Sequence, residues 1–244
     1  PTDLGSGGGG GTSSNGGNGG GAVILAVGGT LNLNGFIGAG GSNGTGSRAS
    51  GGAGGAINIK TAGLSGIGTL NANAGNGISY GSGGGGGRIA ILAAGSNNSN
   101  LTMTAYSGGG AIGYSGAGTI YINNGGDTQL IVSNGGRAAD YATSISSVIA
   151  ETPVLVVGTL SMTNARLMFD NSVAPVITSN ASFSGTNLLA ISSLTVLSDF
   201  TFAGATLQQK STTTLTFIGN LTMESGAKIT TLAYTADSRL FAVN

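Results

Sequence analysis

Short segments in which apolar and polar residues alternate recur along the first half of the chain. The pattern Ile-x-Ile occurs at 57–59, 89–91 and 120–122, and Val23-Ile-Leu is its first member. Alternation with a period of two predicts strands that bury one face. The four segments begin at positions 23, 57, 89 and 120, so the spacing between successive copies is nearly constant. A period of this length is typical of repeat proteins, in which one unit stacks on the next.

A second apolar segment follows each of these strands. Its members are Leu31–Leu33, Leu70–Ala72, Leu101–Met103 and Leu130–Val132. If each copy forms one turn of a wound ribbon, equivalent side chains stack at about 4.8 Å, the spacing between strands in a sheet. The expected ladders are Val23, Ile57, Ile89 and Ile120; Leu25, Ile59, Ile91 and Ile122; and, on a second sheet, Leu33, Ala72, Met103 and Val132.

This pattern predicts an all-β fold, a right-handed parallel β-helix (β-solenoid) with glycine-rich loops on one side. The handedness follows from the strong preference of parallel strands for right-handed crossovers. Helices are not expected, because apolar residues rarely recur at the i, i+3 and i+4 spacing.

Glycine is concentrated where the loops are expected. Of the 50 glycines, 45 lie in residues 1–136, in excursions that recur at one point of the repeat (38–55, 75–87 and 107–118). One physical reason is a positive φ at corners, where the pairs Asn34-Gly35, Asn76-Gly77 and Asn134-Gly135 fit. Another is close approach of main chain to main chain, as in Gly83–Gly87. Extended polyglycine helices are a further conformation open to these runs.

Changes in composition divide the chain into four parts. We expect a glycine-rich lead-in at 1–21, wide coils at 22–136, a connector at 137–157 with a short helix at 138–142, and tighter coils at 158–244. The tighter coils are marked by Leu160, Phe183, Phe200 and Leu221, which follow one another at shorter steps than the copies in the first half. The chain begins with Pro1 rather than Met, which favours a processed or excised piece of a longer product.

Charge and cysteine content narrow the function classes. The 8 basic and 8 acidic residues give a net charge of zero, and no basic stripe is present to bind nucleic acid. No apolar run approaches the length of about 18 residues that indicates a membrane span. Cysteine is absent, so disulfides and thiolate metal sites are excluded. Abundant Ser, Thr, Asn and Gly with few charges favour an extracellular or cell-surface location.

Several segments resemble the glycine-rich repeats of large exported bacterial surface proteins. They are Gly54–Ile59, Thr69–Gly77, Gly83–Ile91 and Gly116–Ile122. The tail Gly219–Ile229 is similar to the short-coil repeats that accompany them. The resemblance implies parallel β-helices and roles in adhesion or the cell envelope. Members of this group are mostly uncharacterised, and no catalytic residue is carried over.

The sequence offers little for catalysis. The eight acidic residues are isolated from one another and histidine is absent, whereas glycan-cleaving sites need clustered carboxylates. The glycine runs lack the Asp of calcium-binding nonapeptides and the Gly-Lys-Ser/Thr of a phosphate loop. We therefore predict no enzyme activity, no cofactor and no metal, and we rank a polysaccharide-acting enzyme third among the functions.

Candidate binding residues lie in or beside the glycine-rich side of the repeat. They are Tyr80, Tyr106, Tyr114, Tyr141 and Arg88. A tyrosine offers an apolar face and a polar tip to a sugar, and an arginine can bind an anionic one. The alternative is that the rings shield loop backbone and that Arg88 caps a corner. Binding of surface glycans through these tyrosines is the second function hypothesis.

The first hypothesis is a structural extracellular module: a stalk, an adhesin or a self-assembling filament subunit. A β-helix ends in open strand edges, which proteins normally cap or charge. Neither end of this chain shows a clear cap, and Leu240, Phe241 and Val243 form an apolar candidate assembly edge. The expected partners are other copies of the chain or flanking coils of a longer solenoid.

Overall fold

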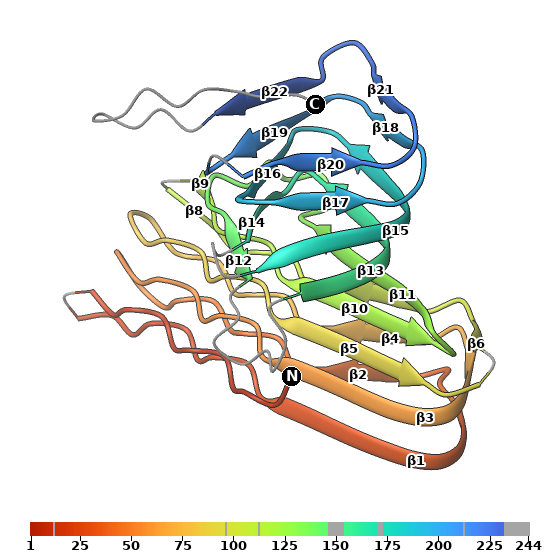
Figure 1. Cartoon of the computed structure of the whole chain (residues 1–244). Coiled ribbons are helices and arrows are strands. Elements are labelled where there is room, and N and C mark those ends of the chain that lie inside the picture. Colours follow the sequence, from red (N-terminus) through yellow and green to blue (C-terminus); the bar gives the residue numbers. More distant parts are fainter. Residues whose placement is uncertain are drawn as a thin grey trace.

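The computed structural model describes residues 1–11, 13–95, 97–111, 113–145, 154–169, 173–211 and 213–231. Their regular secondary structure is β-strand, so the all-β prediction is confirmed (Figure 1). Residues 138–142 form bends and irregular chain, so the short helix predicted there is wrong. In this described part of the chain no helix has the length and apolar character needed to cross a membrane.

The largest sheet contains ten strands. Along its path lie β1 (Ala22–Asn32), β3 (Ala56–Gly66), β5 (Arg88–Ala93), β10 (Thr119–Asn124), β11 (Asp127–Ser133), β13 (Val154–Thr163), β15 (Ala174–Ser184), β17 (Leu194–Val196) and β20 (Leu215–Phe217). The tenth strand, β6 (Asn97–Ser99), pairs with β3 off this path. Neighbours on the path are parallel except β10 and β11, which are antiparallel.

Four smaller sheets complete the described fold. Three are parallel: β2 (Phe36–Gly38), β4 (Thr69–Asn71) and β7 (Thr102–Thr104); β12 (Thr143–Ile145), β14 (Arg166–Phe169), β16 (Asn187–Ile191), β19 (Ala205–Gln209) and β22 (Lys228–Thr231); and β18 (Phe200–Phe202) with β21 (Leu221–Met223). The fourth pairs β8 (Gly109–Gly110) antiparallel with β9 (Gly113–Tyr114). The chain passes from β1 to β2 and from β3 to β4, and then through a glycine-rich segment to the next strand of the large sheet.

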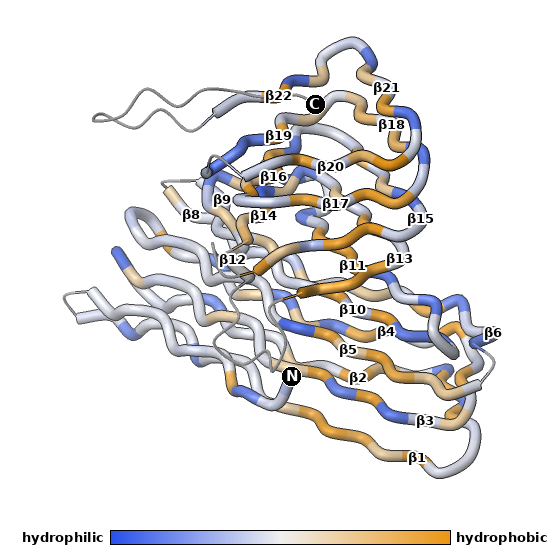
Figure 2. Tube along the Cα trace, in the orientation of Figure 1, coloured by the Kyte–Doolittle hydropathy of each residue, from blue (hydrophilic) through white to orange (hydrophobic). Residues whose placement is uncertain are grey.

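Two of the three predicted ladders are confirmed by the strand register. The first runs through Val23, Ile57, Ile89 and Ile120, and the second through Leu25, Ile59, Ile91 and Ile122. The isoleucines of β3 and β5 in these ladders are at most 1% exposed. Figure 2 shows apolar stretches on successive strands of this sheet. Stacked β-branched side chains that point to one face therefore form the interior.

The third predicted ladder is wrong. The second sheet aligns Ile37 with Leu70 and Leu70 with Met103. The first strand is longer than the pattern indicated, because Leu31 still belongs to β1 and pairs with Leu64. The chain then turns before β2 begins at Phe36. Leu33 and Ala72 are buried, but they lie just outside the paired strands.

The fourth repeat does not form a parallel turn. Its two strands, β10 and β11, form an antiparallel hairpin in which Ile120 lies opposite Ile131. The hairpin turns at Gly125 and Gly126, whose φ angles are +58° and +109°. A two-residue hairpin loop of this type requires positive φ at both positions, which glycine adopts readily. Val132 therefore belongs to a strand that runs opposite to β1, β3, β5 and β10.

Two hydrophobic clusters meet at this hairpin. The first contains Ile57, Ile59, Ile89, Ile91 and Ile122 from the parallel strands before the turn. The second contains Ala117, which precedes β10, and buried residues from Leu130 in β11 to Leu207 in β19. It includes a group of phenylalanine rings in contact with one another: Phe183, Phe200, Phe202 and Phe217. Small stacked aliphatics thus fill one half of the fold, and aromatic rings help to fill the other.

In the second half of the chain, paired residues on neighbouring strands are closer in sequence than in the first half. Val157 pairs with Ile177, Ile177 with Val196 and Val196 with Phe217. In the same half, Phe200 pairs with Leu221 and Met162 pairs with Phe183.

Candidate functional site

Extended glycine-rich segments form layers beside the strands, at the left in Figure 1. We call 15–21, 50–55, 82–87 and 115–118 the incoming segments, because each leads into a strand of the large sheet. We call 39–45, 72–77 and 105–110 the outgoing segments, because each follows a strand of the β2–β4–β7 sheet. Most of their residues lie outside regular strands, yet their backbone groups are extensively hydrogen-bonded.

Backbone hydrogen bonds between successive incoming segments recur every third residue. Gly17 and Gly20 donate to Ser50 and Ala53, and Gly51 and Gly54 donate to Ser82 and Gly85, at N–O distances of 2.8–2.9 Å. The outgoing segments follow the same rule, since Gly41 and Gly44 donate to Asn73 and Asn76 at 2.8 and 3.0 Å. A spacing of three matches an extended helix with three residues per turn, which has no internal hydrogen bonds. Its backbone groups must therefore pair with neighbouring segments.

Each incoming residue faces one of three neighbours according to its place in the triplet. In 50–55, Gly51 and Gly54 donate to the next incoming segment, and Gly52 and Gly55 donate to the outgoing residues Ser42 and Ala39. The remaining two, Ser50 and Ala53, donate to Gly9 and Ser6 of the N-terminal segment, which we define as residues 4–11. Main-chain donors of this segment are thus distributed over three sides.

The predicted close approach of main chains is confirmed in Gly83–Gly87. A Cβ on Gly84 would lie 2.2 Å from the carbonyl oxygen of Gly52, and one on Gly86 would lie 2.0 Å from that of Ala105. A Cβ on Gly85 would have 3.8 Å to its nearest neighbour. The absence of side chains on the facing positions is what allows the layers to hydrogen-bond.

The corner prediction holds at one of its three glycines. Gly135 has a φ of +62°, whereas Gly35 and Gly77 are not in the left-handed region. Gly77 instead serves close packing, since its Cβ would lie 2.5 Å from the main chain of Gly81.

The sequence carries a signal for this arrangement that the alternation of apolar residues does not reveal. Gly-Gly pairs recur with a period of three: Asn-Gly-Gly at 15–17 and 18–20, Ser-Gly-Gly at 50–52, Ala-Gly-Gly at 53–55, and Ser-Gly-Gly at 82–84 followed by Gly85–Gly87. The first position of each triplet is the one that tolerates a side chain, as the open space at Gly85 also shows. The triplet pattern therefore indicates the extended conformation and which neighbouring segment each residue contacts.

Asparagine side chains add a second set of bonds between the outgoing segments. The Oδ1 atom of Asn43 accepts from the backbone N–H of Asn76 at 2.7 Å, and Oδ1 of Asn76 accepts from Gly109 at 2.9 Å. Oδ1 of Asn73 likewise accepts from Tyr106 at 2.6 Å. All three bonds join residues that lie one repeat apart. They fix the register of the glycine-rich layers in the way that a sheet ladder would.

Two of the predicted tyrosines lie against arginines. The guanidinium carbon of Arg48 lies 5.8 Å from the ring centroid of Tyr80, and that of Arg137 lies 5.6 Å from the centroid of Tyr114. Both distances are within the range of cation–π contacts. Tyr80 is 75% exposed and Tyr114 is 37% exposed. Each pair presents a flat ring with an adjacent positive charge at the glycine-rich side.

The other predicted binding residues, Tyr106, Tyr141 and Arg88, take no part in these two arginine–tyrosine pairs. Tyr106 is half-buried, and its ring lies 3.2 Å from the position of a Cβ on Gly135, so it covers the main chain as the alternative reading proposed. Tyr141 is half exposed in a bend. Arg88 forms an ion pair with Asp3 at 3.2 Å on the surface, where such pairs contribute little. The candidate assembly residues Leu240, Phe241 and Val243 lie outside the described residues.

A polar hollow of 390 Å³ accompanies one of the arginine–tyrosine pairs. It is lined by Asn76, Gly77, Gly109, Gly110, Tyr114 and Arg137. The backbone N–H of Tyr114 also donates to Oδ2 of Asp140 at 2.8 Å, which fixes the short hairpin that carries the ring. A guanidinium, an amide and an aromatic ring at one hollow suit hydrogen bonding and stacking with a polar ligand.

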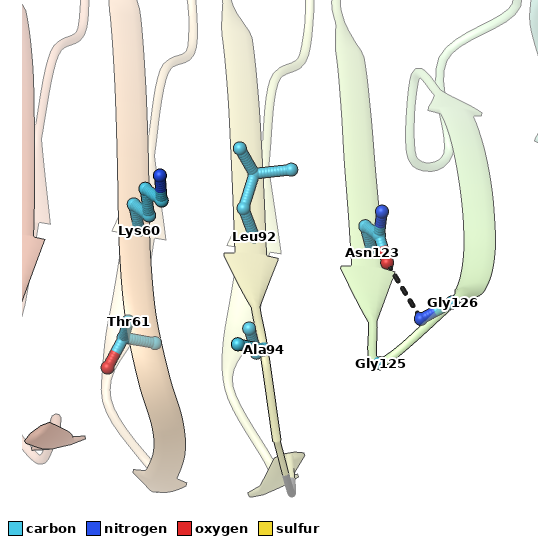
Figure 3. Close-up of a pocket in the computed structure, with 8 residues that line it drawn as sticks. Lys60, Thr61, Leu92, Ala94, Asn123, Gly125 and Gly126 are labelled. Atoms are coloured by element: carbon cyan, nitrogen blue, oxygen red, sulfur yellow. Dashed lines mark hydrogen bonds between the residues drawn. The ribbon is translucent and has the colours of Figure 1, made fainter. Parts of the chain in front are cut away.

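Two further hollows lie at strand ends of the large sheet. The hollow in Figure 3 has a volume of 320 Å³ and includes Lys60, Leu92 and Asn123, which are neighbours across β3, β5 and β10. Oδ1 of Asn123 accepts from the N–H of Gly126 at 3.0 Å and so supports the turn. The second hollow, of 650 Å³, lies beside β11 and β13, and Asp127 is among the residues that line it. Neither combines an acid with a second charged catalytic group.

Three of the described carboxylates support local structure at separate places. Asp3 pairs with Arg88, Asp140 accepts from Tyr114, and Oδ1 of Asp199 accepts from the N–H of Asn220 at 2.8 Å. Within the described ranges, no three Asp, Glu, His or Cys residues gather as a metal site would require. The acidic residues Glu151, Asp170 and Asp237 lie outside these ranges.

No protein-family model, curated protein or solved structure matches this chain. The glycine-rich layers and the arginine–tyrosine pairs are therefore interpreted from their geometry and chemistry alone.

Proposed function

We propose that the chain is a structural module of an exported or cell-surface protein, acting as stalk, adhesin or filament subunit. In this proposal the strands wind as a right-handed parallel β-helix with the glycine-rich loops on one side. Support comes from the register: apart from the β10–β11 hairpin, successive strands on the path of the large sheet are parallel, and β1, β3 and β5 are separated in sequence by strands of another sheet. Parallel crossovers of this kind are right-handed in nearly all proteins.

The observation that carries the assembly role is the edge strand β1. It is a long strand with the sequence AVILAVGGTLN, and it lies at the end of the strand path with β3 as its partner. It contains no charged residue and no proline. Natural proteins normally protect a long edge with such residues, because unpaired backbone groups pair with other chains. Within the part of the chain that the structure describes, the second edge of β1 pairs with no strand, and an edge of this length is suited to pairing with another copy or with a flanking coil.

Concentration-dependent assembly is the expected result for the wild-type chain. Ile24 is 63% exposed on β1, and Ala26 is also exposed, opposite Lys60 of β3. Replacing both with glutamate leaves the buried face unchanged and places charge on the edge. We expect multi-angle light scattering to give a mass that increases with concentration for the wild type and a monomer mass for the Ile24→Glu/Ala26→Glu variant.

The matched control is Ile67→Glu, which replaces a 73% exposed side chain outside β1. It is expected to assemble as the wild type does. A wild-type chain that stays monomeric across the dilution series contradicts self-assembly and leaves flanking coils as the partner of the β1 edge.

Recognition of surface glycans is a second candidate function. It is favoured by the exposed rings of Tyr80 and Tyr114, each with an arginine against it, and by the polar hollow beside Tyr114. Aromatic faces pack on the apolar faces of sugars, while arginine donates hydrogen bonds to hydroxyl or carboxylate groups.

A glycan array tests this second function. The variant Tyr80→Ala/Tyr114→Ala is expected to lose any binding that the wild type shows, because it removes both stacking surfaces. Tyr141→Ala is the matched control, since Tyr141 is half exposed and does not line the hollow. Binding that survives the double substitution, or an array without signal, rules out this use of the tyrosines.

A further inference from the structure

The strand pairings of the second half end in β20, β21 and β22, at the top in Figure 1. In the strand before β21 in this pairing, Phe200 and Phe202 are each 1% exposed. Their partners in β21, Leu221 and Met223, are 37% and 46% exposed. Paired residues of parallel strands point to the same side, so Leu221 and Met223 point toward the interior. They are exposed because β21 has no second partner strand among the described residues.

β20 and β22 show the same change in exposure. Val196 is fully buried, whereas its partner Phe217 in β20 is partly exposed. Leu207 is 1% exposed, and its partner Ile229 in β22 is partly exposed. The last three strands therefore leave a set of inward-pointing apolar side chains incompletely covered. We call this set the open end; its members are Leu215, Phe217, Leu221, Met223 and Ile229.

The chain itself supplies a segment of suitable composition and length. β22 ends at Thr231, and the thirteen residues 232–244 follow it directly. We call them the C-terminal segment. It contains two apolar groups, Leu232–Tyr234 and Leu240–Val243, with polar residues between them. Thirteen extended residues span up to roughly 45 Å, whereas a three-residue strand such as β21 is about 10 Å long. The C-terminal segment is therefore long enough to return across the open end.

The charges of the open end and of the C-terminal segment are complementary. Glu224, which follows β21, and Lys228, the first residue of β22, are exposed. Neither forms an ion pair with another described residue. The C-terminal segment carries one charge of each sign, on Asp237 and Arg239. Exposed ion pairs contribute little energy, so these charges would orient the segment while burial of apolar surface holds it.

Two observations favour the C-terminal segment over a second copy as the occupant. The segment is joined to β22 at the open end itself, and a short connection gives an effective concentration in the millimolar range. A second copy must bind at its own concentration. Its β1 would also meet β20 with opposite chain direction, because the strands from β11 onward run opposite to β1. It could not continue the parallel pairing.

We propose that the C-terminal segment folds back over the open end and caps it, with Leu240, Phe241 and Val243 in contact with Leu221 and Met223. Stacked folds need such a terminal cap, because their last unit otherwise exposes the core. The predicted assembly edge thus becomes a contact within the chain. The cap closes this end to other copies and leaves assembly to the β1 edge. It follows from the exposure of the open end and does not depend on the proposed function.

Engineered cysteines test the contact, because the chain has none of its own. In the full chain, Met223→Cys is combined in turn with Leu240→Cys, Phe241→Cys or Val243→Cys. A short bis-maleimide reagent is expected to link at least one of these pairs within a single chain, which peptide mass spectrometry identifies. The matched control combines the same three with Ile67→Cys, at a 73% exposed position between β3 and β4. The yield is expected to exceed that of the control at least about tenfold.

A second variant, Leu240→Ser/Phe241→Ser, weakens the cap and leaves the described residues unchanged. The dye ANS binds exposed apolar surface, and its fluorescence is expected to rise at least about twofold as the open end is uncovered. The matched control is Leu4→Ser, which replaces a 71% exposed leucine in the N-terminal segment and is expected to leave the fluorescence unchanged.

Three results overturn the inference, each by itself. The first is an intrachain link no more frequent than in the Ile67→Cys controls. The second is a link that forms only between chains, because the occupant of the open end would then be a second copy. The third is ANS fluorescence that Leu240→Ser/Phe241→Ser leaves at the wild-type value. Light scattering of the wild type tests the β1 edge alone, so failure of self-assembly is distinguished from failure of the cap.

Discussion

Alanine at Gly84 is expected to lower the free energy of unfolding by roughly 1–3 kcal/mol, the usual cost of forcing extra atoms into a packed interior. Its Cβ would lie 2.2 Å from the oxygen and 2.5 Å from the carbonyl carbon of Gly52. Both are backbone atoms, so no side-chain rotation relieves the overlap. Segments 50–55 and 82–87 must separate, which weakens the hydrogen bonds that join them.

The same substitution at the adjacent Gly85 is the matched control. Because its Cβ has 3.8 Å of space, stability is expected to stay unchanged or to rise by up to about 1 kcal/mol, as alanine restricts the unfolded chain. Urea denaturation followed by circular dichroism compares the two variants. If Gly84→Ala and Gly85→Ala unfold at the same urea midpoint, the conclusion that each residue of the triplet contacts a different neighbour is contradicted.

Removal of the ring of Phe202 is expected to lower the free energy of unfolding by about 3–5 kcal/mol, the range for phenylalanine in a packed core. Phe202 is 1% exposed, and its ring centroid lies 5.1 Å from that of Phe183 and 6.1 Å from that of Phe200. An alanine there leaves a cavity that the flanking strands cannot fill, because their register is fixed by backbone bonds.

Phe36→Ala is the corresponding control in the first half. Phe36 is 67% exposed, so its loss is expected to change stability by no more than about 0.5 kcal/mol. Thermal unfolding of Phe202→Ala and Phe36→Ala at equal protein concentration gives the comparison. A similar midpoint for both would mean that the aromatic cluster does not hold the second half together.

The parts of the fold that the sequence predicts well are those in which side chains alternate strictly. Ile57 and Ile59 are separated by a polar residue and recur at nearly constant spacing, so their ladders follow from periodicity alone. The second sheet is harder to predict. Leu31 and Leu33 are both apolar, and hydropathy does not indicate that β1 ends between them. Strand ends are set there by turn geometry.

The hairpin at Gly125-Gly126 departs from the predicted repeat because two signals conflict there. A pair of glycines between two apolar runs is itself a hairpin signal. The repeat spacing favours a fourth parallel turn, and only the backbone pairing of Ile120 with Ile131 separates the two possibilities. Local turn chemistry is the better guide at this point.

The candidate site is predicted in part. Its location on the glycine-rich side follows from composition, but the pairing of Arg48 with Tyr80 depends on the repeat length, since the two lie one repeat apart in the sequence. Arg137 and Tyr114 lie closer in sequence than one repeat and meet across the short hairpin and the bend after β11, which periodicity does not describe. A contact between residues one repeat apart, such as Arg48 and Tyr80, can thus be predicted from the sequence, whereas the contact between Arg137 and Tyr114 cannot.

The reversal at β10 and β11 has a consequence for any higher-order structure. The strands before it all run one way along the large sheet, and those after it, from β11 to β20, run the other way. A second copy displaced along the direction in which the strands succeed one another would bring its β1 next to β20, the last strand of the path in the described residues, and the two would meet with opposite chain direction. Growth from end to end therefore cannot extend a single ladder of uniform polarity. Each boundary would repeat the change of direction that the chain already makes once within itself.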